Sequence, residues 1–230
     1  MTQKRRLTDI VIAIDGPAGA GKSTTAREVA RRLDLLFLDT GAMYRAITLK
    51  AIRSGLDLND QPKIVDMTNS TTLLFKIIDH EQHLFMDGED VSAEIRRPDV
   101  TAGTTPISGH AEVRKILVKW QQEIGARGGV VAEGRDTTSV VFPNAEVKIF
   151  MLADLQARAE RRVRDLAKIG VTTTVAEQQE LLAKRDHADS SRAASPLTKV
   201  PDAREIDTSN LTFEEQVQKI IDLAHQVTTV

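Results

Sequence analysis

The 230-residue chain is predicted to form an α/β domain around a parallel sheet, and two observations indicate this class. Short apolar runs alternate with segments of helical periodicity along most of the chain, a pattern typical of parallel strands joined by helical crossovers. A glycine-rich loop also separates the first apolar run from the first amphipathic segment. Glycines clustered at such a junction indicate a backbone that must approach another group closely. We therefore expect a sheet covered by helices on both faces.

The N-terminal part of the chain contains two strand and helix pairs. Residues 10–14 have the continuous apolar character of a buried strand, and residues 23–33 carry apolar side chains at helical spacing. A second short strand is predicted at 35–38. The helix that follows it ends before Gly55, because glycine commonly terminates helices.

Residues 60–98 interrupt this alternation. The runs "LLFKIID" and "HLFMDGEDV", separated by a short polar segment, are predicted to form a β-hairpin at 70–91 that is followed by a glycine turn. An antiparallel hairpin is foreign to a chain of alternating strands and helices. We therefore interpret this segment as an insertion.

The alternation resumes after the insertion and continues to the C-terminal end. Thr212 and Glu215 are spaced as a capping box at the start of the last helix. The predicted helices span 111–126, 154–168, about 175–187 and 212–227, and the predicted strands span 128–134, 145–153 and 204–209.

Composition narrows the classes of function. The formal net charge is −2 with one Trp, one Tyr and six Phe, so the chain lacks the basic field and stacking surface of typical nucleic-acid binders. It has no cysteine, and no apolar run approaches the roughly 18 residues that span a bilayer. The run "IVIAI" is too short for the core of a signal peptide. We expect a cytoplasmic monomer that has neither a nucleic-acid polymer nor a membrane as partner.

The glycine-rich loop matches the pattern G-x-x-x-x-G-K-[ST] without a mismatch. Backbone N–H groups of such a loop converge on one point, and the following helix N-terminus adds partial positive charge, so the loop suits polyphosphate oxygens. Lys22 is expected to contact the β and γ phosphates of a nucleoside triphosphate, and Ser23 to ligate Mg²⁺. The predicted ATP-binding residues are Gly16, Pro17, Ala18, Gly19, Ala20, Gly21, Lys22, Ser23 and Thr24. The loop alone does not separate a kinase from a GTPase or a motor ATPase.

Two charged segments follow predicted strands and suggest where a second ligand binds. Arg45 lies one helical turn after the second strand, and "EGRD" at 133–136 follows the apolar run "VVA". The carboxyl ends of parallel strands face the ligand crevice in such sheets. Either arginine alone would suit a solvated surface, but two at strand ends favour an anion site.

Eight segments distributed over nearly the whole chain indicate a family. They are "IDGPAGAGKST", "LDTGAMYRA", "GEDVSAEIR", "VRKILVKWQ", "GRD", "VVFPNAEVKIFMLA", "RAERR" and "RDHADSSRAASPL". In these segments and in their order the chain resembles the bacterial cytidylate kinases, a branch of the nucleoside monophosphate kinases. The resemblance implies a P-loop NTPase fold with a five-stranded parallel sheet flanked by helices, in one kinase domain spanning 1–230. It also implies a monophosphate-binding insertion at 60–108 with a small antiparallel sheet, and a short mobile lid at 155–173.

The resemblance implies a set of residues that clamp the acceptor phosphate, read cytosine and hold the sugar of CMP. The clamps are Arg45, Arg135 and Arg185, the cytosine readers are Thr105, Arg114 and Asp136, Asp189 with Arg192 handles the sugar and phosphate, and Thr40 and Tyr44 complete the set. If the segment is helical, Arg185, Asp189 and Arg192 fall at i, i+4 and i+7 and share one face.

The resemblance also implies catalytic arginines in the lid. Arg158, Arg161 and Arg162 fall on one face of the predicted charged helix and would close over the transferring phosphoryl group. The alternative for these charges is solvated ion pairing along a surface helix. The implied catalytic residues are Lys22, Arg135, Arg185, Arg158 and Arg162.

Four positions depart from the family pattern. Glu133 stands where Asp is usual, with an implied role in orienting Mg²⁺-bound water, and Thr40 and Thr105 stand where Ser is common. These changes keep the chemistry, because carboxylate and hydroxyl groups are retained. Thr138 stands where glycine is frequent in the family, so the family pattern does not predict the backbone conformation after "GRD".

The expected reaction is transfer of the γ-phosphoryl group of ATP to CMP or dCMP, which gives CDP or dCDP and ADP. Alternatives remain: a kinase of another acceptor such as UMP, a regulatory GTPase, or a binding module without turnover. A GTPase would need a guanine-reading motif of the N-K-x-D type, and the sequence contains none.

Overall fold

The computed structural model describes residues 5–78, 81–168 and 170–228, and the chain divides into two compact units. The larger unit comprises Met1–Leu38 and Gly125–Val230, and the smaller unit comprises Asp39–Ile124. The smaller unit contains the whole of the predicted insertion at 60–108.

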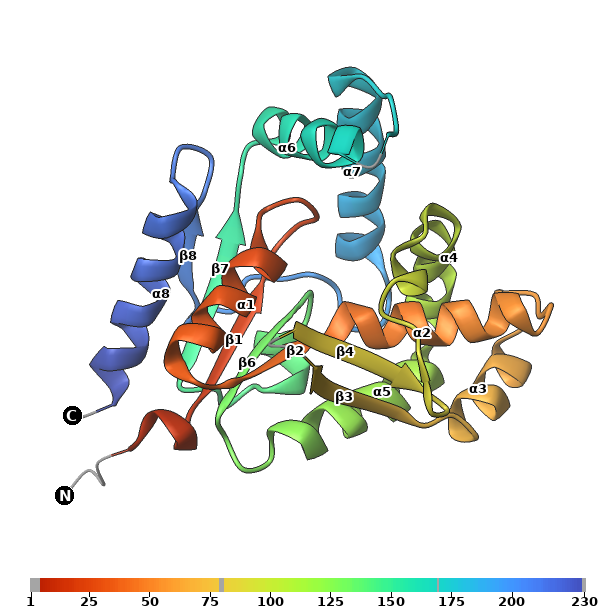
Figure 1. Ribbon diagram of the computed structural model, residues 1–230, viewed down its shortest axis with the longest axis horizontal. Helices are drawn as coiled ribbons and strands as arrows, with labels where there is room; N and C mark the ends of the chain where they lie inside the picture. Colours follow the sequence, from red (N-terminus) through yellow and green to blue (C-terminus); the bar gives the residue numbers. More distant parts are fainter. Residues whose placement is uncertain (1–4, 79–80, 169, 229–230) are drawn as a thin grey trace. The chain divides into compact units, whose positions relative to one another are not determined.

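The larger unit is built on a five-stranded sheet with the order β2-β6-β1-β7-β8 (Figure 1). β1 lies at the centre and pairs in parallel with β6 and β7, while β7 pairs in parallel with β8. Every residue of β1 and β6 is buried, which explains the apolar run with which each strand begins. The predicted parallel sheet is confirmed. The strands are β1 Val11–Asp15, β2 Leu36–Asp39, β6 Val130–Gly134, β7 Val147–Leu152 and β8 Arg204–Asp207.

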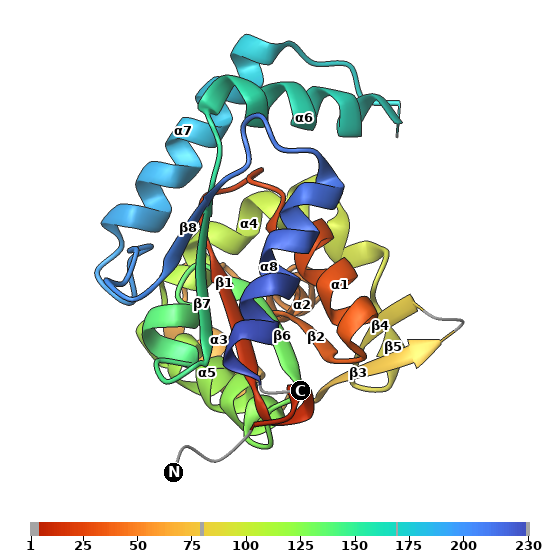
Figure 2. The ribbon, with the colours of Figure 1, turned by 90° about the vertical axis from the view of Figure 1, so that its left-hand side faces the viewer.

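Helices α1 (Lys22–Leu33) and α8 (Phe213–Val227) lie side by side on one face of this sheet (Figure 2). Their apolar stripes join those of the strands in one cluster that includes Ile12, Val29 and Ile220. Burying each such side chain contributes roughly 1.5–3 kcal/mol. Thr212 and Glu215 form the predicted capping box of α8.

Two further helices of the larger unit, α6 (Leu155–Lys168) and α7 (Val175–Ser191), pack against each other (Figure 1). Ala159 of α6 and Leu182 of α7 share a buried cluster with Ala18 of the glycine-rich loop. Helix α7 continues to Ser191, beyond its predicted end at 187. None of the helices in the described part of the chain is long and apolar enough to cross a membrane.

The smaller unit contains the predicted hairpin, with a short third strand that was not predicted. Strands β3, β4 and β5 form an antiparallel sheet in that order. Apolar residues such as Leu84 and Met86 on β4 pack with Ala46 and Leu49 on α2. The elements are α2 Thr40–Arg53, α3 Gln61–Asn69, β3 Leu73–Ile78, β4 Glu81–Met86, β5 Glu89–Asp90, α4 Pro98–Gly109 and α5 Ala111–Gly125.

Helices α3 and α4 were also not predicted. α3 begins with Asp60, whose side chain accepts from the N–H of Lys63, and carries a proline in its first turn, where the missing N–H is tolerated. α4 contains Pro106 in its interior, which disfavours a helix locally. Its packing overrides that preference, because a Cβ added at Gly103 would lie 2.8 Å from Leu58 and 3.0 Å from Thr48.

Candidate active site

The glycine-rich loop connects the end of β1 to the start of α1 and lies against the end of β7. A Cβ at Gly16 would lie 1.9 Å from the carbonyl oxygen of Met151, and the φ angle of Gly16 is 149°. Gly21, immediately before α1, has a φ of 90°. Only glycine combines this close approach with such backbone angles, so the motif glycines determine the path of the loop.

Lys22 is buried at the start of α1, and its Nζ donates to the carbonyl oxygen of Pro17 at 2.8 Å. Burial, followed by the positive charge of Arg135, lowers the pKa of Lys22 to about 7, while Glu133 and Asp15 oppose this effect. The charge of Arg185 also lowers the Lys22 pKa. The charges of Arg135 and Arg185 thus act on Lys22, and positive groups in one region suit phosphate binding.

Ser23 and Glu133 supply neighbouring oxygen atoms at this place. The Ser23 hydroxyl donates to Oε1 of Glu133 at 2.6 Å. Mg²⁺ prefers oxygen ligands and is usually held by one or two protein groups together with substrate phosphates. The described residues contain no cluster of three or more His, Cys, Asp or Glu side chains that could hold a metal by themselves. The donor set at Ser23 thus fits Mg²⁺ bound jointly with phosphates.

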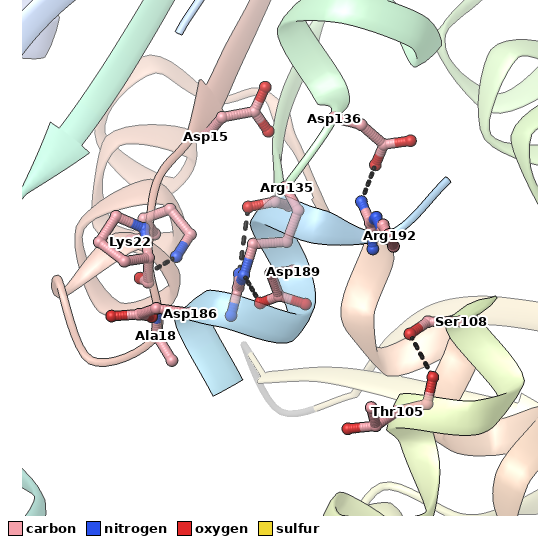
Figure 3. Close-up of polar contacts among 12 residues, drawn as sticks. Asp15, Ala18, Lys22, Thr105, Ser108, Arg135, Asp136, Asp186, Asp189 and Arg192 are labelled. Atoms are coloured by element: carbon pink, nitrogen blue, oxygen red, sulfur yellow. Dashed lines mark hydrogen bonds and ion pairs between the residues drawn. The ribbon is translucent and has the colours of Figure 1, made fainter. Parts of the chain in front are cut away.

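Arg135 follows β6 and forms an ion pair with Asp189 of α7, in which Nε donates to Oδ2 at 2.8 Å (Figure 3). Burial disfavours the charged guanidinium, but Asp189 and Glu133 outweigh burial and raise the Arg135 pKa. Figure 3 also shows Arg192, whose Nη2 lies 3.9 Å from Oδ1 of Asp136. The end of β6 is thereby linked to the end of α7 at two points.

Arg185 and Asp189 lie four residues apart within α7, as predicted, whereas Arg192 directly follows the helix. Helix α7 ends at Ser191, and Arg192 has extended angles of φ −61° and ψ 139°. Its Nε donates to the carbonyl oxygen of Ser195 at 2.6 Å. The arginine that pairs with Asp189 is Arg135, which follows β6.

The arginines of the predicted lid lie within α6, as predicted, but they have different surroundings. Arg158 is buried, and its Nη1 donates to the carbonyl oxygen of Ala18 at 3.0 Å and to Oδ2 of Asp186 at 2.6 Å. Arg161 donates to the hydroxyl and carbonyl oxygens of Thr208, whereas Arg162 is exposed. Residues three and four apart lie on one side of a helix, and here that side meets α7, the end of β8 and solvent.

Two acidic residues of this region were missed by the sequence analysis. Asp15 ends β1, is fully buried and accepts hydrogen bonds from Thr137 and Thr138. Asp186 accepts from Arg158 and, at 3.4 Å, from the N–H of Ala18. The available signal for Asp15 was a carboxylate that directly follows the apolar residues of a predicted buried strand. No local pattern marks Asp186.

In the smaller unit, Arg45 and Thr40 lie at the start of α2. Asp39 caps this helix by accepting from the N–H of Ala42 at 2.8 Å, and its other oxygen accepts from Nη2 of Arg45 at 2.8 Å. Burial raises the pKa of Asp39, but Arg45 and the cap outweigh it and leave the pKa below its usual value. Asp39 therefore orients the guanidinium of Arg45.

A second group of the smaller unit includes Tyr44, Thr105 and Arg114. The guanidinium of Arg114 lies 5.4 Å from the centre of the Tyr44 ring, and its Nη1 donates to the carbonyl oxygen of Ser108 at 3.1 Å. Thr105 is exposed on α4, and its carbonyl oxygen accepts from the Ser108 hydroxyl (Figure 3). Tyr44 on α2 and Thr105 on α4 are thus both linked to Arg114 on α5, the former directly and the latter through Ser108.

The smaller unit also has a cavity of about 430 Å³ lined by Met43, Phe75 and Trp120 among others. None of the site residues predicted from the sequence is among the described residues that line it. This cavity therefore does not contribute to the candidate site.

Comparison with known families decides the affiliation of this site. The sequence profile of the family described as cytidylate kinase matches residues 12–226. The chain belongs to the cytidylate kinase family. A cytidylate kinase of Pediococcus pentosaceus is 46% identical over 210 residues, which cover 91% of this chain and 93% of that protein. A cytidylate kinase of Lysinibacillus sphaericus is 46% identical over 218 residues, 95% of this chain and 97% of that protein.

The chain also shares its fold with a solved structure of much lower sequence identity. An uncharacterized protein from Eubacterium ventriosum superimposes with a TM-score of 0.52 at 14% identity, over 95% of this chain and 99% of that one. At this level of identity the likeness concerns the fold alone. The affiliation with cytidylate kinases therefore depends on sequence similarity over nearly the whole chain.

Proposed function

We propose that the protein transfers the γ-phosphoryl group of ATP to the 5′ phosphate of CMP or dCMP, giving CDP or dCDP and ADP. The observation that carries this proposal is the glycine-rich loop with the buried Lys22, on which the charges of Arg135 and Arg185 act, in a chain of the cytidylate kinase family. Phosphoryl transfer needs little covalent help from the protein and depends on positioning and charge neutralisation. Positive groups in one region suit that requirement.

In the proposed reaction, an oxygen of the acceptor phosphate attacks the γ phosphorus. The bond between that phosphorus and the oxygen bridging it to the β phosphate breaks, and ADP leaves with the bond electrons. Lys22 holds the β and γ phosphates, while Arg135 and Arg185 offset the negative charge of the acceptor and of the group in transfer. An arginine acting in this way is worth roughly 10³ to 10⁵ in rate.

Ser23 is proposed as the protein ligand of Mg²⁺, with Glu133 acting through a bound water. When bound, the ion supplies charge neutralisation and orientation for the phosphates of ATP. The hydrogen bond of 2.6 Å from the Ser23 hydroxyl to Glu133 supports this assignment, because it holds the two oxygen atoms that would serve the ion next to each other.

Thr40, Tyr44 and Arg45 on α2 are proposed to bind the acceptor. Within the described structure, Nε of Arg45 is buried and has no hydrogen-bond partner, which is costly unless a ligand oxygen accepts from it. The other acceptor-binding residues are Thr105, Arg114, Arg135, Asp136, Arg185, Asp189 and Arg192.

Residues 60–108 are proposed as the monophosphate-binding insertion and residues 155–173 as the lid, within one kinase domain. The start of the proposed lid is attached to the glycine-rich loop, because Arg158 donates to the carbonyl oxygen of Ala18 at 3.0 Å. Arg158 and Arg162 are retained as proposed catalytic residues on closure. The cytoplasmic location and the monomeric state remain predictions.

A coupled assay of ADP release across CMP, dCMP, UMP, AMP and GMP tests the proposal. We expect kcat/KM for CMP to exceed that for UMP by at least about tenfold, the low end of the discrimination from base-specific hydrogen bonds. Highest activity with UMP would instead support a uridylate kinase. Nucleotide binding without ADP release from any acceptor would indicate a binding module.

A further inference from the structure

Asp15 makes four hydrogen bonds that the proposed reaction does not explain. Its Oδ1 accepts from the N–H of Thr137 at 2.8 Å and from the hydroxyl of Thr137 at 2.7 Å. Its Oδ2 accepts from the N–H of Thr138 at 2.7 Å and from the hydroxyl of Thr138 at 2.6 Å. All four donors belong to two consecutive residues that are themselves buried.

A buried carboxylate at position 15 is energetically unfavourable unless hydrogen bonds compensate its desolvation. Asp15 has an exposure of 0% in the central strand of the sheet, where the neighbouring residues are apolar. Transfer of a charge to such surroundings costs several kcal/mol unless hydrogen bonds compensate it. Burial accordingly raises the pKa of Asp15, and the bonds from Thr138 and Thr137 oppose that rise. An isolated packing role would be served better by an apolar side chain.

The two threonines begin a π-helical turn, Thr137–Val141, whose first residues need partners for their N–H groups. An aspartate immediately before a helix commonly provides them through its own side chain. Here that residue is Asp136, and among the described residues its side chain makes no cap bond to the turn. Asp15, 122 positions away, accepts from the Thr137 N–H in its place.

We propose that Asp15 is a positioning residue that caps the turn after β6 and so allows the carboxylate of Asp136 to serve acceptor recognition. This inference rests on the proposed function, in which Asp136 reads cytosine and Arg135 holds the acceptor phosphate. Because Asp15 directly precedes Gly16, the same side chain ties the start of the ATP loop to the acceptor-binding segment. Without Asp15, the Asp136 side chain is drawn to its own turn.

Thr138, which replaces a glycine frequent in the family pattern, agrees with this role of Asp15. A glycine at that position would offer Asp15 its N–H but no hydroxyl, so the threonine adds the bond of 2.6 Å to Oδ2. The backbone path that the sequence left open is therefore held by the side chain of Thr138 as well as by its N–H.

The test compares Asp15→Asn and Thr137→Val with wild type. We expect KM for CMP to rise at least about tenfold in Asp15→Asn and the CMP to UMP ratio of kcat/KM to fall, with the ATP KM changed less than about threefold. Thr137→Ser should behave like wild type, because serine keeps the hydroxyl that Thr137→Val removes. Thr25→Val is the matched control, because Thr25 loses one buried hydroxyl bond, to Gln216 at 3.1 Å, elsewhere in the same unit.

A purely structural Asp15 would lower kcat with both acceptors by one factor and leave the CMP KM and the ratio unchanged, which would overturn the proposal. A Thr137→Val variant that behaves like Thr25→Val would overturn it as well. If Asp15→Asn does not fold, KM for CMP and the CMP to UMP ratio of kcat/KM in Thr137→Val and Thr138→Val test the proposal. Wild-type turnover of CMP tests the proposed function separately. Amide hydrogen exchange at residues 137–138 supplies a substrate-independent readout, and unchanged exchange in the variants would also refute the inference.

Discussion

The contact between Arg158, Asp186 and Ala18 allows a quantitative prediction about how α6 and α7 hold the ATP loop. The guanidinium donates to Asp186 at 2.6 Å and to the carbonyl oxygen of Ala18 at 3.0 Å. The side chains are 8% and 23% exposed for Arg158 and Asp186 respectively. This pair is therefore shielded from water to a degree that surface ion pairs are not.

Asp186→Ala would leave the charge of Arg158 buried without its carboxylate. We expect a loss of about 3 kcal/mol in the free energy of unfolding, the low end of the range for breaking a buried pair, because Asp186 is partly exposed. Arg158→Met combined with Asp186→Ala completes a double-mutant cycle. The expected coupling energy is about 1.5–3 kcal/mol, the value of a hydrogen bond between charged groups.

Urea unfolding followed by far-UV circular dichroism measures all four proteins of the cycle. Lys184→Ala is the matched control, because Lys184 pairs with Glu180 at 2.6 Å on the same helix with both side chains exposed, and its loss should leave the midpoint unchanged. The ATP KM should rise in Asp186→Ala, since Ala18 belongs to the phosphate loop. A coupling energy below about 0.5 kcal/mol would refute the reasoning, because the two side chains would then act independently.

Four further outcomes are expected. Lys22→Ala should keep the fold and lose about 10³-fold in kcat; retention of more than a tenth of wild-type kcat would contradict its phosphate contact. Arg135→Lys should raise KM for CMP with little change for ATP, because an ammonium cannot replace a bidentate fork, and an equal rise for both nucleotides would argue against an acceptor role. Asp136→Asn should collapse the CMP to UMP ratio mainly through loss on CMP, and an equal loss on both acceptors would mean that Asp136 does not read the base. Gly16→Ala should cost at least about 3 kcal/mol in thermal unfolding experiments, since its Cβ would meet the Met151 carbonyl oxygen, and a variant of wild-type stability would contradict that packing.

The sequence by itself determined those features whose information is local. The glycine loop was predictable because its glycines, Lys22 and Ser23 stand at fixed spacing between an apolar run and a helix. The hairpin at 70–91 and the capping box of α8 were predictable for the same reason, since alternation and cap spacing act between near neighbours. The positions of Arg45 and Arg135 after two strands favoured an anion site, but their role as clamps of the acceptor phosphate needed the family resemblance.

Only the tertiary structure decided which distant groups pair. Helix α4 contains Pro106 and lacks a strong apolar stripe, yet it forms because Gly103 allows close packing against Thr48. Arg192 leaves α7 and approaches Asp136, while Asp189 pairs with Arg135. Such pairs are separated by tens of residues, so periodicity cannot encode them. A buried carboxylate is stabilised only by donors that lie within about 3 Å. Which donors lie that close depends on how the whole sheet and its helices pack.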